Sequence, residues 1–146
     1  MRNALWTIEV PKFQQKRDHT CGLACVRYLL AHKNMKVNES DLVDLFKCTK
    51  DHGVLPQNMI NGLRSIGVSC SDGHSRGLSS LKRGALLLTD YDKYSHWISV
   101  QDIGDEHSCI FCPWDGLQKI PNTDLEKDWK MSIDGNNYNQ YFINID

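Results

Sequence analysis

The stretch Gln15-Lys-Arg-Asp-His-Thr-Cys21-Gly-Leu-Ala-Cys25 places a cysteine where an irregular polar segment meets a run of apolar residues. Leu23, Val26 and Leu30 then recur at helical spacing, which predicts a helix that begins near Cys21. Unpaired N–H groups and the helix dipole favour an anion at such a position, so we expect them to lower the pKa of the Cys21 thiol. Cys21 is therefore a candidate nucleophile.

Three other residues suit the chemistry of an attacking thiol. Gln15 lies six residues upstream, where its side-chain amide and the Cys21 backbone N–H would stabilise an oxyanion. Gly22 has no side chain and leaves room for a substrate backbone beside the sulfur. His96 opens the predicted strand 96–102 and is a candidate general base. A histidine at a strand start is commonly structural, and Cys21 is what gives His96 its functional interpretation.

The order of the predicted elements indicates the fold class. Apolar spacing and capping residues predict helices over 21–31, 39–47 and 56–64 and a helical turn over 78–83. Alternating or continuous apolar runs predict strands over 5–10, 68–70, 85–89, 96–102, 109–112 and 141–145. Helices come mostly before strands, so we expect an α+β fold with N-terminal helices packed on a C-terminal antiparallel sheet. The absence of a linker or repeat predicts one domain over residues 1–146.

Composition and charge argue against several classes of protein. Lys and Arg are scattered and the net charge is −1, so we expect no nucleic-acid partner. No apolar run approaches the ~20 residues that span a bilayer, and no signal peptide is evident. The six cysteines therefore predict reduced thiols in a protein that is cytoplasmic or delivered as an effector. The oligomeric state is left open.

The motifs around Cys21 and His96 resemble those of the C39-type peptidases. These papain-fold enzymes have a Gln six residues before a Cys-Gly pair and, later, a His that starts a strand. The resemblance extends from Val10 to about Gly116. It implies a papain-like fold, a cysteine peptidase that acts on a peptide or protein, and no metal or organic cofactor. It also implies a catalytic set of Cys21, His96 and Gln15.

One position departs from the family pattern. Where the family has an Asp-Pro pair on the next strand, this chain has Cys112-Pro113, followed two residues later by Asp115. A neutral thiol is a poor partner for an imidazolium, so we predict that Asp115 reaches back to orient His96. The alternative is a Cys-His pair without a carboxylate, which would retain part of the activity.

The same residues allow other interpretations. A papain-like site can also deamidate a glutamine or transfer its acyl group to an amine, and a toxin or effector is an alternative setting for such an enzyme. Cys112 in place of the acid favours a third interpretation, an inactive papain-like fold that binds a peptide or protein. Cys109 and Cys112, with His107 nearby, resemble half of a zinc site. On a strand these two cysteines point to opposite faces, so burial is the preferred explanation, as it is for Cys25.

Overall fold

A computed structural model describes residues 20–50, 53–91, 94–133 and 135–145. The predicted strand 5–10 and Gln15 lie outside these residues. Three helices come first: α1 (Cys21–Ala31), α2 (Glu39–Leu45) and α3 (Pro56–Ser65). Each helix begins at its predicted residue, and α2 ends at Leu45, two residues before its predicted end. Pro56 occupies the first turn of α3, where the missing N–H has no helical partner to lose. Gly67 follows the end of α3 with a φ of 84°, a left-handed conformation that favours glycine.

Within the described residues, six strands form one antiparallel sheet in the order β1-β8-β2-β3-β4-β5. The strands are β1 (Cys70–His74), β2 (Leu86–Tyr91), β3 (Tyr94–Ile103), β4 (His107–Cys112), β5 (Gly116–Pro121) and β8 (Tyr141–Ile145). A 3-10 helix, η3 (Leu78–Ser80), precedes β2. After β5 come α4 (Asn122–Asp128) and the small pair β6 (Ser132–Ile133) and β7 (Asn136–Asn137).

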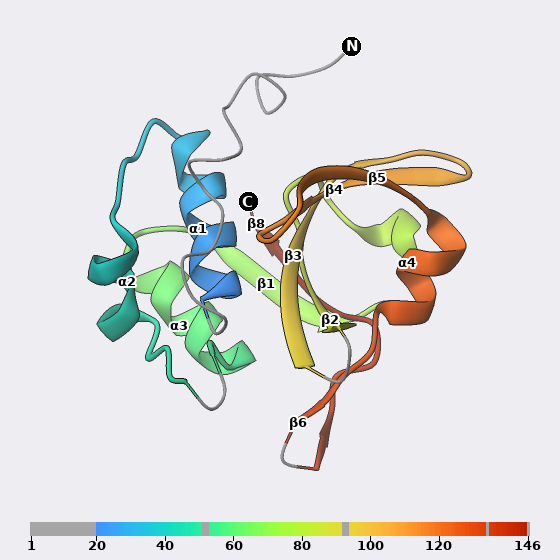
Figure 1. Ribbon diagram of the computed structural model, residues 1–146. Coiled ribbons are helices and arrows are strands. Elements are labelled where there is room, and N and C mark those ends of the chain that lie inside the picture. Colours follow the sequence, from blue (N-terminus) through green and yellow to red (C-terminus); the bar gives the residue numbers. More distant parts are fainter. Residues whose placement is uncertain (1–19, 51–52, 92–93, 134, 146) are drawn as a thin grey trace.

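The sheet is covered on both faces. Helices α1, α2 and α3 lie on one side of it and α4 lies on the other (Figure 1). Side chains of β2 alternate accordingly: Leu86 and Leu88 pack with the first three helices, and Leu87 packs with Leu125 and Trp129 at α4. Burial of both faces explains why this strand is a continuous apolar run in the sequence.

Three details differ from the sequence expectations. The strand predicted at 68–70 begins at Cys70 and continues to His74, because β8 supplies backbone partners to this polar segment. β5 and α4 were not predicted, since the half-exposed side chains of β5 hide its alternation. His96 does not open its strand: β3 begins at Tyr94, two residues earlier, and pairs antiparallel with β2.

No helix in the described part of the chain is both long and apolar enough to cross a bilayer.

Candidate active site

Cys21 is the first residue of α1, as the sequence predicts. Its side chain is 4% exposed and packs in the core between the helices and the sheet. The Cys21 sulfur accepts a hydrogen bond from the backbone N–H of Trp97 at 3.5 Å. The helix start is thereby joined to β3, 76 residues further along the chain, at the residue that follows His96.

Trp97 joins these two elements through several contacts. Its carbonyl accepts a hydrogen bond from the Cys25 thiol at 3.4 Å, one turn along α1. Its indole N–H donates to the carbonyl of Val54 at 2.8 Å, and its side chain is 2% exposed. Three hydrogen bonds therefore fix β3 against α1 and the segment before α3, and they set the position of Cys21 relative to the strand.

Gly22 has a different role from the one we expected. We predicted that it leaves room for a substrate, but it is buried. A Cβ atom at this position would lie 3.0 Å from both Met59 Cε and Trp97 Cδ1, and 3.3 Å from Val54 Cβ. The missing side chain thus permits α1 to pack closely against its neighbours, and the space beside it is filled by the protein itself.

His96 lies on β3, opposite Thr89 of β2, and its side chain is 5% exposed. The Thr89 hydroxyl donates to the His96 carbonyl at 2.9 Å, which anchors the backbone at this point. The imidazole Nε2 lies 3.4 Å from the sulfur of Cys112, at the end of β4. The structure therefore brings His96, on β3, next to Cys112, on β4.

Asp115 lies in the turn after β4 and contacts Cys112, which in turn contacts His96. The Cys112 thiol donates to Asp115 Oδ2 at 3.8 Å. Burial lowers the pKa of His96, and the charge of Asp115 partly opposes that shift. The sequence drew attention to Asp115 and to the substitution at Cys112 separately. It did not indicate that the thiol lies between the carboxylate and the imidazole.

Burial keeps both the proposed nucleophile, Cys21, and the proposed base, His96, uncharged. It raises the pKa of Cys21 from 9.0 to about 11, against the opposing effect of hydrogen bonds from the Trp97, Gly22 and Cys21 backbones. It lowers the pKa of His96 from 6.5 to about 4, against the opposing effect of Asp115. The expectation that the helix start lowers the Cys21 pKa is therefore wrong here, because desolvation exceeds the effect of the backbone N–H groups. At neutral pH the resting state is a thiol and a neutral imidazole.

The buried imidazole predicts a loss of stability in acid. Between pH 6.5 and pH 4 the unfolded chain binds a proton at His96 that the folded protein does not, so the free energy of unfolding falls as pH falls. The full shift corresponds to about 3 kcal/mol. Urea unfolding at pH 7 and pH 4 measures it, with His96→Gln expected to show a smaller difference between the two pH values. The exposed His107→Gln is the control, and an equal fall in wild type and His96→Gln would contradict the prediction.

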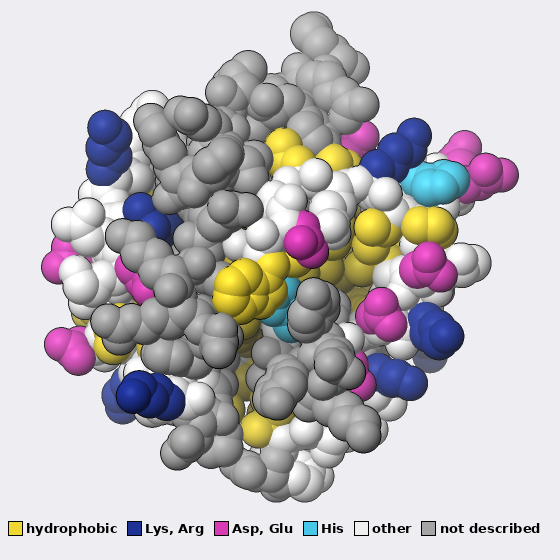
Figure 2. Space-filling view, viewed as in Figure 1, with side chains coloured by type: hydrophobic (Ala, Val, Ile, Leu, Met, Phe, Trp, Pro, Cys, Tyr) yellow, Lys and Arg dark blue, Asp and Glu magenta, His cyan; other side chains and the backbone are white. Residues whose placement is uncertain are grey.

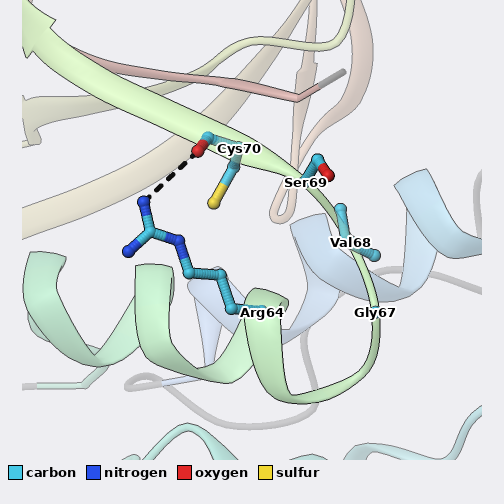
Figure 3. A pocket seen from close by; sticks show the side chains of 5 residues that line it. All are labelled: Arg64, Gly67, Val68, Ser69 and Cys70. Carbon is cyan, nitrogen blue, oxygen red and sulfur yellow. Dashed lines mark hydrogen bonds between the residues drawn. The ribbon is translucent and has the colours of Figure 1, made fainter.

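A surface pocket of about 490 Å³ lies elsewhere, between the end of α3 and the start of β1 (Figure 3). Its lining residues are Arg64, Gly67, Val68, Ser69 and Cys70. The Arg64 guanidinium donates to the carbonyl of Cys70 at 3.5 Å across it. None of these residues belongs to the set around Cys21 and His96, so the pocket is not part of the candidate active site.

The described residues contain no group of three or more His, Cys, Asp or Glu side chains that could hold a metal ion. Cys109 and Cys112 lie on β4, where Cys109 is half-buried and Cys112 is buried. On the face shown in Figure 2, basic side chains of the described residues are spread among acidic ones and form no continuous basic patch.

The arrangement of helices and sheet, with a cysteine at the start of the first helix and a histidine on the facing strand, defines an α+β domain of the papain-like class. A family model described as the peptidase C39 family matches residues 9–133. The chain therefore belongs to the peptidase C39 family, a family of cysteine peptidases. The recognition made from the sequence and the predicted fold class are both confirmed.

Solved structures share this fold. The peptidase domain of Streptococcus ComA, a bifunctional ABC transporter involved in quorum sensing, superposes with a TM-score of 0.77 at 13% identity, covering 90% of this chain and 94% of that one. A double glycine motif protease from an AMS/PCAT transporter, solved in complex with the leader peptide, gives a TM-score of 0.73 at 16% identity, covering 94% and 91%. The Streptococcus mutans ComA peptidase domain gives 0.66 at 14% identity, covering 91% and 96%. No curated protein matches the chain in sequence.

Proposed function

We propose that the protein is a cysteine peptidase that cleaves a peptide or protein by acyl transfer to the Cys21 thiol. The observation that carries the proposal is the 3.5 Å hydrogen bond from the Trp97 N–H to the Cys21 sulfur, because it holds the thiol beside the strand residue that follows His96. Membership of a cysteine peptidase family supports the reaction class. A structural neighbour in complex with a leader peptide supports a peptide as the substrate.

The neutral resting state determines how the reaction begins. His96 accepts the Cys21 proton as the sulfur attacks the scissile carbonyl carbon, which gives a tetrahedral oxyanion and an imidazolium. The imidazolium then protonates the leaving amine as the C–N bond breaks. Water hydrolyses the resulting thioester with His96 again acting as base. The Cys21 backbone N–H and Gln15 are the proposed oxyanion donors, and Gln15 lies outside the described residues.

Alkylation by iodoacetamide, mapped to each cysteine between pH 5 and pH 9, tests whether His96 acts as the base for Cys21. An imidazole with a pKa of about 4 is already neutral over this range and the thiol stays protonated, so alkylation of Cys21 assisted by His96 should vary little with pH. In His96→Ala the reaction needs free thiolate, and its rate should rise by about tenfold for each pH unit. At pH 6 the wild type should therefore react at least about 10²-fold faster at Cys21 than the variant.

A matched comparison comes from Cys25, which lies one turn along α1 and contacts the same strand residue. Its pKa is raised by burial, and it has no assigned base. If Cys21 reacts no faster than Cys25 at every pH, and His96→Ala leaves the profile unchanged, the proposed pair is wrong.

A second function is favoured by the electrostatics of the site. Cys112 occupies the position of the family's acid, and burial raises the pKa of Cys21 to about 11. Both features suit a papain-like fold that binds a peptide without cleaving it. Binding without cleavage would leave a peptide mixture unchanged in mass while the peptide is retained by the protein, whereas the proposed peptidase produces new termini.

A further inference from the structure

The side chains of His96, Cys112 and Asp115 form a series that ends in a carboxylate. The distance from His96 Nε2 to Cys112 Sγ is 3.4 Å, and that from Cys112 Sγ to Asp115 Oδ2 is 3.8 Å. We propose that Cys112 is a positioning residue through which Asp115 orients His96, the thiol transmitting a contact that a carboxylate makes directly elsewhere in the family. This inference rests on the proposed role of His96 as the base.

The donors and acceptors of the series fix where its protons lie. An ionised carboxylate only accepts, so Asp115 requires Cys112 to donate its S–H. The sulfur then accepts from His96, which requires the ring proton on Nε2. Nδ1 is consequently the unprotonated nitrogen, and in the proposed reaction it is the atom that accepts the Cys21 proton. The series thus selects one of the two tautomers of the neutral imidazole.

The surroundings of Cys112 favour the protonated thiol that this scheme needs. Its side chain is 4% exposed, and burial raises its pKa, with Asp115 adding to the rise against hydrogen bonds from the Asp115 and Trp114 backbones. A thiolate at Cys112 would also compete with Cys21 for the charge on His96. Keeping Cys112 neutral leaves the imidazolium, once it forms, to be stabilised by Asp115.

Among the described residues, the titratable groups that interact with Cys21 or His96 include Cys25 on α1, Cys48 after α2, Cys112 on β4 and Asp115 in the turn after β4. Among these described groups Asp115 is the acid, and its charge raises the pKa of His96. Removing that charge should lower this pKa further, because the opposing desolvation remains.

Nitrogen-15 NMR of the imidazole ring tests the series without relying on catalysis. In the Cys21→Ala protein at pH 7, we expect His96 to carry its proton on Nε2. Adding Cys112→Ala or Asp115→Asn should produce a mixture of the two tautomers. A proton on Nδ1 in the parent, or an unchanged tautomer in both added variants, would overturn the inference. This measurement stays informative even if Cys21 proves unreactive and the proposed function fails.

The alkylation rate at Cys21 supplies a second, independent readout. Cys112→Ala and Asp115→Asn should each lower the His96-assisted rate by about tenfold, as part of the general-base effect. The double variant should be no slower than the slower single one, because both residues act in one series. Cys112→Ser retains a donor and an acceptor and should recover most of the loss. Losses that add in the double variant would overturn the inference.

Controls separate positioning from unfolding. Cys109→Ala removes a thiol from the same strand and should leave the rate at Cys21 unchanged. Asp115 is exposed, so Asp115→Asn should fold as the wild type does, and it carries the test even if a substitution at the buried Cys112 destabilises the protein. A rate in Asp115→Asn equal to the wild-type rate, with an unchanged tautomer, would show that the carboxylate has no role.

Discussion

Substituting Cys21 with alanine is expected to lower peptide hydrolysis by at least about 10³-fold, because it removes the nucleophile and with it the thioester route. The fold should survive: the substitution removes one buried sulfur, a change that costs about 1 kcal/mol. The measurement is mass spectrometry of a peptide mixture of varied sequence after incubation with each protein. Cleavage appears as new termini, whereas deamidation of a glutamine appears as a gain of about one dalton, so the same data separate the two papain-like reactions.

Cys25→Ala is the matched control for this substitution. Cys25 lies on the same helix, is fully buried, and contacts Trp97 as Cys21 does, but through the carbonyl. Its removal should cost stability of the same order and leave hydrolysis largely intact. Cleavage that persists in Cys21→Ala would rule out the proposed nucleophile. An equal loss in Cys25→Ala would show that packing against β3, and not the thiol itself, is what the reaction needs.

Local sequence patterns predicted the elements that carry the site. The start of α1 at Cys21 follows from apolar spacing, and the strand that holds His96 follows from its apolar run. That these two residues lie on neighbouring elements could not be derived from spacing, because 76 residues separate the hydrogen-bonded Cys21 and Trp97. The family resemblance supplied that connection. Long-range pairing depends on how the whole sheet packs, which a local pattern does not encode.

The remaining differences have physical causes that only the packed structure contains. The helix start was expected to favour a thiolate, but burial of Cys21 outweighs it. Asp115 was expected to contact His96, but Cys112 lies between them in the hydrogen-bonded series. Gly22 was expected to leave space for substrate, but Trp97 and neighbouring side chains fill it. In each case the environment of the residue in the packed structure decides its charge state or its contacts, and the sequence alone does not show that environment.

The Trp97→Ala substitution is expected to have the largest effect on stability. The indole is 2% exposed in the main core, and its N–H satisfies the Val54 carbonyl at 2.8 Å. Removing a buried aromatic ring of this size costs about 3–5 kcal/mol, and the unpaired carbonyl adds to that cost. Urea unfolding at pH 7 measures the loss. Trp97→Phe keeps most of the ring but not the N–H, so it should lose an intermediate amount.

Trp114→Ala provides the comparison at an exposed site. This tryptophan is 39% exposed, in the turn after β4, so the same substitution should change the free energy of unfolding by only about 0.5 kcal/mol. Trp97 also holds the Cys21 sulfur through its backbone N–H, which alanine retains. If Trp97→Ala lowers stability but leaves the alkylation profile of Cys21 intact, the backbone alone positions the thiol. If it costs no more than Trp114→Ala, the indole does not join β3 to the helices as the structure indicates.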